Sequence, residues 1–135
     1  MITYQQIKTI AESNVLALYT QVGWSAYTRQ PEQLLTAIAQ SLEVITAWND
    51  QELVGLIRAV GDGVTILYIQ DILVLPSYQN QGIGTQLMKT MLACYPEVRQ
   101  KVLLTEEAPD TRHFYQKMGF SSCDKGEAVA FYREF

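Results

Sequence analysis

The most informative stretch of this sequence reads Asp71-Ile72-Leu73-Val74-Leu75-Pro76-Ser77-Tyr78-Gln79-Asn80-Gln81-Gly82-Ile83-Gly84-Thr85-Gln86-Leu87-Met88. It leads from an apolar strand through a proline and a polar turn, which carries two glycines, into an amphipathic helix. A turn of this kind leaves backbone N–H groups free at the N-terminus of a helix, and such groups attract anions. The stretch therefore predicts a loop that binds a diphosphate.

The composition is that of one globular domain. The chain has 135 residues, of which 48% are hydrophobic and 18% are charged, which is enough to bury a sizeable core. We expect a single domain over residues 1–135. No apolar run approaches the ~20 residues that a membrane-spanning helix needs, and the N-terminus lacks the basic-then-apolar order of a secretory signal. We expect a cytoplasmic protein without a membrane partner.

The charged residues and the cysteines exclude two kinds of site. The net charge is −4 and the ten Lys and Arg residues are scattered, whereas a nucleic-acid surface needs clustered positive charge. An acidic protein binds an anion through locally aimed backbone donors. Cys94, Cys123 and the single His113 have no metal-ligand spacing. We therefore expect no nucleic-acid partner and no metal, and we favour two buried free thiols over the alternative of a disulfide.

The first part of the chain shows helical spacing. Residues 2–4 suit a short strand, and Ser13 or Asn14 is expected to cap a helix that ends at Gly23. A polar connector over residues 25–30 leads to Pro31, which is well placed in the first turn of a second helix. Both helices are amphipathic and are expected to be half-buried.

From Glu43 onward the apolar period becomes that of strands. Residues 44–48 and 53–60 are predicted to form a hairpin around Asn49-Asp50, which is a turn signal. Residues 64–74 form a long, nearly continuous apolar run, as expected of a strand buried on both faces.

After the glycine turn the sequence returns to alternating helices and strands. The helix that begins near Ile83 stops before Pro96, and residues 102–105 suit a strand parallel to the one before that helix. Asp110 is expected to cap a short helix that Gly119 ends. Residues 120–132 resemble a last pair of strands. The expected class is α/β (α+β), with the order β-α-α-β-β-β-α-β-α-β-β.

Two common phosphate-binding loops do not match. A Walker loop needs a lysine after its second glycine, and this position holds Thr85. A dinucleotide fingerprint begins where the first strand ends and carries a third glycine, but Gly82 lies well beyond Val74 and Leu87 stands at the third position.

A third pattern matches closely. It consists of Val74-x-Pro76, then Tyr78-Gln79-x-x-Gly82-x-Gly84 at the start of a helix, and Phe114-Tyr115-x-x-x-Gly119-Phe120 about thirty residues later. In these segments and in its element order the sequence resembles the GNAT superfamily of acyl-coenzyme A-dependent N-acetyltransferases over essentially the whole chain. The resemblance implies the GNAT fold, a mixed central sheet flanked by helices, and transfer of acetyl from acetyl-coenzyme A to a primary amine in a ternary complex.

The resemblance also implies where the cosubstrate acetyl-coenzyme A binds. The loop that would wrap its pyrophosphate with main-chain N–H groups consists of Gln79, Asn80, Gln81, Gly82, Ile83, Gly84 and Thr85. The strand that ends at Val74 would part from residues 102–105, so that the pantetheine arm pairs with the backbone near Ile72, Leu73 and Val74. The main chain of Leu73 or Val74 would polarise the thioester carbonyl. Phe114 is expected to contact the coenzyme.

Catalytic groups are suggested by position. Tyr115 matches the family's general acid, and the alternative is a half-buried helix aromatic. Tyr68, Gln70 and Asp71 lie where the family places a base or a water relay. Asp71 is the only carboxylate in an apolar run, where a lone acid is costly unless used or paired; the alternative is an Asp that caps backbone groups or lies at a bulge.

The acceptor side is less defined. Trp24 and Tyr27 follow the first helix, where the family builds its acceptor pocket, although Trp24 also suits an anchor at the edge of the core. We expect a small-molecule amine as acceptor. A protein lysine or N-terminus, an aminoacyl-tRNA, and a catalytically silent acyl-coenzyme A sensor stay as alternatives. The sequence leaves open whether the chain forms a homodimer.

Overall fold

The computed structural model describes residues 1–134 and divides into two compact units, Met1–Leu104 and Thr105–Phe135. The first unit holds one sheet with helices on both of its faces. The second holds a helix and an irregular segment. The elements are, in order, β1 (Ile2–Gln6), α1 (Glu12–Gln21), α2 (Ser25–Thr28), α3 (Pro31–Ala39), β2 (Glu43–Asn49), β3 (Glu52–Gly61), β4 (Ile66–Val74), η1 (Pro76–Tyr78), α4 (Ile83–Cys94), β5 (Gln100–Leu103), α5 (Pro109–Lys117) and η2 (Cys123–Lys125).

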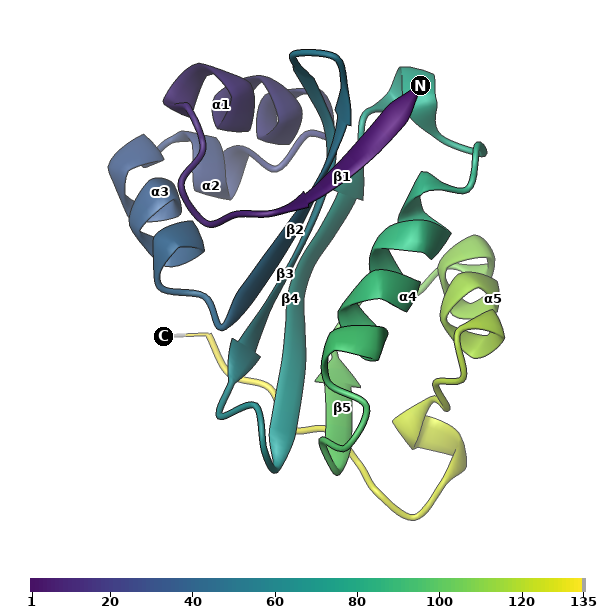
Figure 1. The fold of residues 1–135 in the computed structure, drawn as a ribbon. Coiled ribbons are helices and arrows are strands. Elements are labelled where there is room, and N and C mark those ends of the chain that lie inside the picture. Colours follow the sequence, from purple (N-terminus) through teal and green to yellow (C-terminus); the bar gives the residue numbers. More distant parts are fainter. Residues whose placement is uncertain (135) are drawn as a thin grey trace. The chain divides into compact units, whose positions relative to one another are not determined.

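The five strands lie side by side in chain order, β1-β2-β3-β4-β5. The first three junctions are antiparallel, whereas β4 and β5 are parallel and are connected through α4, as the sequence predicted. Helices α1, α2 and α3 cover one face of the sheet and α4 covers the other (Figure 1). The fold class expected from the sequence, a mixed sheet flanked by helices, is confirmed.

Strands β4 and β5 run together for only part of their length. Their pairing begins at Ile66 opposite Gln100 and ends at Ile69 opposite Leu103. Strand β4 continues to Val74, and over residues 70–74 no other described strand pairs with it on the β5 side. The two strands therefore part at Gln70, and β4 presents an open backbone edge beyond that point.

A bulge interrupts β4 at the same place. Arg58 of β3 lies opposite Asp71, and the next residue of β3, Ala59, lies opposite Ile69. Gln70 is thus an extra residue with no partner in β3. A bulge of this kind reverses the face to which the following side chains point.

The sheet packs closely on α4. A Cβ atom built at Gly55 of β3 would lie 3.2 Å from Cγ2 of Ile83 and 3.3 Å from Cδ1 of Leu87. Gly55 therefore allows the first turn of α4 to approach the sheet. This contact holds the N-terminus of α4, and the glycine turn before it, against the carboxyl end of β4.

Local details of the helices differ from the sequence prediction. The residue before α1 is Ala11 and the residue before α5 is Ala108, so Ser13, Asn14 and Asp110 lie inside the helices and do not cap them. The connector over residues 25–30 contains the short helix α2, which was not predicted.

The predicted last pair of strands is wrong. Over the described residues from 120 to 134 the only regular element is the single turn η2. Val129 and Phe131 alternate as strand residues would, but their side chains are 67% and 94% exposed. A strand needs a neighbouring strand, and the described residues of this unit include none.

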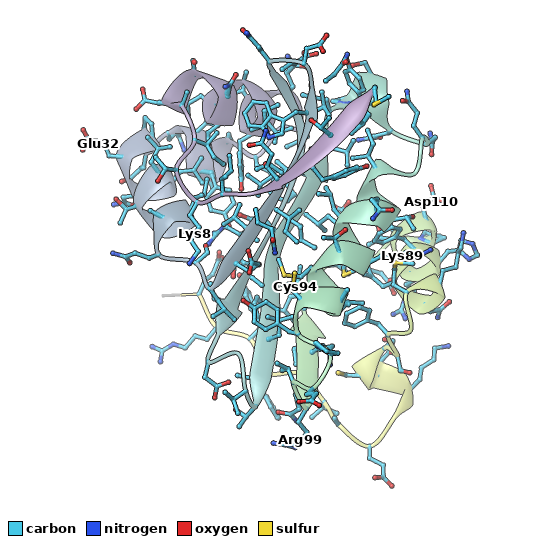
Figure 2. The ribbon with its side chains drawn as sticks, viewed as in Figure 1. Lys8, Glu32, Lys89, Cys94, Arg99 and Asp110 are labelled. Atoms are coloured by element: carbon cyan, nitrogen blue, oxygen red, sulfur yellow. The ribbon has the colours of Figure 1, made fainter. Side chains whose placement is uncertain are left out.

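The two cysteines are free, as expected, but they are less buried than predicted: Cys94 is part-exposed and Cys123 is exposed. Among the described residues no helix is long and apolar enough to cross a membrane, and no group of His, Cys, Asp and Glu side chains is arranged to hold a metal ion. Glu32 on α3, Lys89 on α4 and Arg99 lie well apart, which agrees with the scattered charge of the sequence (Figure 2).

Candidate functional site

A buried ion pair lies between the sheet and helices α1 and α2. Nε of Arg58 on β3 lies 2.6 Å from Oδ2 of Asp71 on β4, and the two side chains are only 6% and 2% exposed. The bulge at Gln70 brings these side chains face to face. Burial disfavours the charged guanidinium, but the carboxylate of Asp71 outweighs that effect, and the pKa of Arg58 is raised.

Two tyrosine hydroxyls complete the surroundings of Asp71. The hydroxyl of Tyr19 on α1 donates to Oδ2 and that of Tyr27 on α2 donates to Oδ1, both at 2.9 Å. Burial, and then the nearby charge of Asp71, raises the pKa of both tyrosines. Both phenols therefore stay protonated at neutral pH, and both carboxylate oxygens of Asp71 are engaged as acceptors.

Arg58 connects this pair to the surrounding elements. Its Nη1 donates to Oγ of Ser41 at 3.3 Å and its Nη2 donates to the Tyr27 hydroxyl at 3.4 Å. Arg58, Tyr19 and Ser41 were not among the predicted site residues. A signal was present in the sequence: Arg58 is the only charged residue within 53–60, just as Asp71 is within 64–74. Opposite charges on neighbouring buried strands favour pairing.

The predicted acceptor residues lie next to this network. The rings of Trp24 and Tyr27 are tilted by 37° with their centroids 6.1 Å apart, and both side chains are half-buried. Nε2 of the exposed Gln70 donates to the Tyr27 hydroxyl at 3.2 Å. Tyr68 lies on the same face of β4 as Asp71, because it pairs with Val60. The structure thus brings together four predicted residues of the first unit, Trp24, Tyr27, Gln70 and Asp71, and places Tyr68 on the same face of β4 as Asp71.

The open edge of β4 presents particular backbone groups. Leu75 N–H donates to the carbonyl of Val54 on β3 at 2.8 Å. Backbone groups of successive strand residues point to opposite sides, so Leu73 faces β3 whereas Ile72 and Val74 face the side from which β5 has parted. The carbonyl of Val74 accepts a hydrogen bond from Nε2 of Gln79 at 3.1 Å.

The glycine turn before α4 has an unusual backbone conformation. Asn80 and Gly82 have φ values of +63° and +84°, in the left-handed region. Gly82 immediately precedes α4, a helix of 12 residues whose first turn has no side-chain cap. The N–H groups of that turn, from Ile83, Gly84 and Thr85, have no partner within the helix. A Cβ atom built on Gly82 meets no atom within 4 Å, so the space beside Gly82 itself is open.

In the second unit, Tyr115 lies on α5 and is half-buried. Its ring makes edge contacts with Phe114 and Phe120, at centroid distances of 5.1 and 6.0 Å. Burial raises the pKa of Tyr115, although a side-chain hydrogen bond with Thr105 acts in the opposite direction. The phenol therefore keeps its proton at neutral pH.

The acidic residues around α5 have two kinds of environment. Nε and Nη2 of Arg112 donate to the two carboxylate oxygens of Glu107 at 2.6 and 2.8 Å, and Nη2 also donates to Asp124 at 3.0 Å. The hydrogen bonds from Arg112 lower the pKa of Glu107. Glu107 is therefore engaged within its own unit, whereas Glu106 and Asp110 are exposed.

Comparison with known proteins identifies an acetyltransferase. A family model described as an acetyltransferase (GNAT) domain matches residues 40–122. A solved GNAT family acetyltransferase from Streptococcus pneumoniae TIGR4 is 39% identical with a TM-score of 0.83, covering 99% of this chain and 100% of that one. The chain therefore belongs to the GNAT acetyltransferase family, and it is an acetyl-coenzyme A-dependent acyltransferase.

Two curated relatives are similar over most of this chain. An uncharacterized N-acetyltransferase of Prochlorococcus marinus, described as ycf52-like, is 29% identical over 136 residues, which span 96% of this chain and 73% of the relative. Serotonin N-acetyltransferase 2, chloroplastic, of Oryza sativa subsp. japonica is 30% identical over 121 residues, which span 86% of this chain and 60% of that protein.

Proposed function

We propose that this chain moves the acetyl group of acetyl-coenzyme A directly onto the primary amine of a small molecule within a ternary complex. The observation that carries the proposal is the open edge of β4, where residues 70–74 have parted from β5 immediately before the uncapped turn of α4. An extended thiol arm can pair with such an edge, while the N–H groups of the turn hold a pyrophosphate.

Acetyl-coenzyme A supplies the activated acetyl thioester. The turn from Gln79 to Thr85 binds its pyrophosphate, and Ile72 and Val74 offer backbone groups to its pantetheine arm. We assign to the N–H of Val74, and not to that of Leu73, the polarisation of the thioester carbonyl, because Leu73 faces β3. A preorganised backbone donor of this kind stabilises the oxyanion that forms during acyl transfer.

Tyr115 is proposed as the general acid. Its raised pKa keeps the phenol protonated at neutral pH, so that it can donate a proton to the departing thiolate. Phe114, beside it on α5, is proposed to contact the coenzyme. The motif match from Phe114 to Phe120 supports both roles.

Asp71 receives a different role from the one expected. A general base needs a free lone pair within reach of the amine, but Asp71 is 2% exposed and accepts hydrogen bonds from Arg58, Tyr19 and Tyr27. We propose that it positions Tyr27. Tyr68 and Gln70 stay as proposed contacts of the amine or of a relay water.

The chemistry of Cys94 supports direct transfer. Burial raises the pKa of its thiol, and Glu43 adds to this effect. A thiol that is not ionised is a poor nucleophile, so Cys94 is poorly suited to carry a covalent acetyl group.

The half-buried rings of Trp24 and Tyr27 support an acceptor that carries an apolar or aromatic group next to its amine. The name of the rice relative, a serotonin N-acetyltransferase, agrees with such an acceptor.

The experiment is a release assay for free coenzyme A thiol. The purified chain is given acetyl-coenzyme A and, in turn, an arylalkylamine, a polyamine, an aminoglycoside and a lysine-containing peptide. We expect turnover with a small amine and strong loss of kcat in Tyr115→Phe. Turnover with the peptide alone would exclude a small-molecule acceptor, and an acetylated enzyme trapped by mass spectrometry without amine would exclude direct transfer.

A further inference from the structure

The hydrogen-bond network around Asp71 fixes the direction of every proton in it. An ionised carboxylate can only accept hydrogen bonds. The hydroxyl of Tyr27 has a single hydrogen, and it lies 2.9 Å from Oδ1 of Asp71. Because Arg58 has no acceptor atom, its Nη2 donates to the Tyr27 oxygen and does not receive from it. The Tyr27 hydrogen therefore points to Asp71, and the Tyr27 oxygen has only lone pairs to offer.

This arrangement determines the orientation of the Gln70 side chain. An amide could turn either its oxygen or its NH2 group toward a hydroxyl. Since the Tyr27 oxygen offers only lone pairs, the NH2 group is the one that must face it, in agreement with the contact of 3.2 Å between Nε2 and the hydroxyl. The carbonyl oxygen Oε1 of Gln70 is then directed away from Tyr27.

Gln70 is well placed to use that oxygen. Its side chain is exposed, it is the extra residue of the bulge, and it lies where β4 and β5 part. The hydroxyl of Tyr27 contacts it, and the ring of Trp24 lies next to that of Tyr27. The donor side of the amide is polarised by the chain of hydrogen bonds that ends on the Asp71 carboxylate.

We infer that Tyr27 is a positioning residue that orients the Gln70 amide, and that Oε1 of Gln70 accepts a hydrogen bond from the substrate amine. This inference rests on the proposed function, because the amine is the group that is recognised. A neutral acceptor binds a primary amine without requiring its ammonium form. Recognition by Oε1 is therefore compatible with the uncharged nucleophile that acyl transfer needs.

The test is a double-mutant cycle read through the KM for the amine. Gln70→Met removes the acceptor and Tyr27→Phe removes the hydroxyl that orients it while keeping the ring. Each is expected to raise the KM for the amine roughly 2- to 12-fold, the worth of one hydrogen bond, with the KM for acetyl-coenzyme A unchanged. Because Tyr27 acts through Gln70, adding Tyr27→Phe to Gln70→Met is expected to cause no further increase.

Two controls separate this inference from folding and from the proposed function. Tyr95→Phe removes another tyrosine hydroxyl bonded to a carboxylate, that of Glu43 at 3.0 Å, outside the site, and it is expected to leave the KM for the amine unchanged. Turnover by the unaltered chain tests the proposed function. The orientation of Gln70 is tested without substrate by the NMR signals of its side-chain NH2 group, identified by their loss in Gln70→Met and expected to shift in Tyr27→Phe.

Effects that multiply in the double variant would overturn the inference, because Tyr27 would then act independently of Gln70. An unchanged amine KM in Gln70→Met, or unchanged NH2 signals in Tyr27→Phe, would overturn it as well. Each of these results would leave the acetyltransferase activity itself intact.

Discussion

Removing either partner of the buried pair between Arg58 and Asp71 should strongly destabilise the fold. Arg58→Met leaves the buried carboxyl group of Asp71 without its cationic partner, although the hydroxyls of Tyr19 and Tyr27 still contact it, and Asp71→Asn leaves a buried guanidinium without a counter-ion. Each single substitution is expected to lower the free energy of unfolding by about 3–5 kcal/mol. Domains of this size are stable by only about 5–15 kcal/mol, so these losses are large.

The double variant should be much less affected than the sum of the two changes. With both charges removed, the remaining cost is that of unmade hydrogen bonds, about 1–3 kcal/mol. The two single effects add up to about 6–10 kcal/mol, so the coupling free energy between the residues should be at least about 3 kcal/mol.

The measurement is urea unfolding of the unaltered chain and the three variants, followed by circular dichroism at pH 7. A repeat in 1 M salt should leave the coupling nearly unchanged, because buried charges are screened little. Arg112→Met is a matched control: it also removes an arginine that is paired with carboxylates, but the partners of Arg112, Glu107 and Asp124, are exposed. Its effect should be far smaller.

A coupling below about 1 kcal/mol, the value typical of exposed ion pairs, would refute this reasoning. It would mean that water reaches Asp71. Asp71 would then again be a candidate for the general base, and the proposal that it positions Tyr27 would have no physical support.

Three further predictions concern the active site. Tyr115→Phe should lower kcat by on the order of 10² to 10⁴-fold. Because burial raises the pKa of Tyr115, the loss of its proton should not lower kcat/KM below pH ~10. A decrease of kcat/KM near neutral pH that disappears in Tyr115→Phe would contradict the role of Tyr115 as general acid. Val74→Pro, which removes the N–H at the open edge, should reduce kcat by about 10² to 10³-fold, while Val74→Ala should retain most activity; equal losses in both would remove the backbone donor from the mechanism. Gly82→Ala places a side chain at a φ of +84°, which costs about 1–2 kcal/mol, and should raise the KM for acetyl-coenzyme A without changing that for the amine, as initial-rate kinetics can show.

The parts of the fold that sequence reasoning predicted correctly are those that local patterns determine. The strand before Pro76, the glycine turn and α4 follow from apolar periodicity and from the conformation that Gly82 allows. The prediction of the final strands failed for a physical reason. Residues 127–132 alternate like a strand, but strand formation depends on a partner that is remote in sequence. The prediction of helix caps failed at Ser13 and Asp110, because residue types that cap a helix also occur inside its first turn.

The candidate site was predictable only in part for a related reason. Asp71 was recognised as costly in an apolar strand, but its partner depends on the register between β3 and β4. No local pattern reveals the extra residue that sets that register. The lone charges in residues 53–60 and 64–74 suggest that Arg58 and Asp71 pair, but without the register the sequence does not distinguish a paired carboxylate from a general base.

The bulge at Gln70 explains why this ion pair and the exposed amide occur together. Before the bulge, Ile69 pairs with Ala59 and so shares a face of the sheet with Gly55, which contacts α4. In a regular strand, Asp71 would point to that same face, where the buried residues of α4 are apolar: Ile83, Leu87, Met88 and Met91. The extra residue turns Asp71 to the opposite face, toward Arg58 and the tyrosines of α1 and α2. The same irregularity leaves Gln70 outside the ladder, beside the hydroxyl that Asp71 orients. One inserted residue thus satisfies the buried carboxylate and places an amide acceptor where β4 and β5 part.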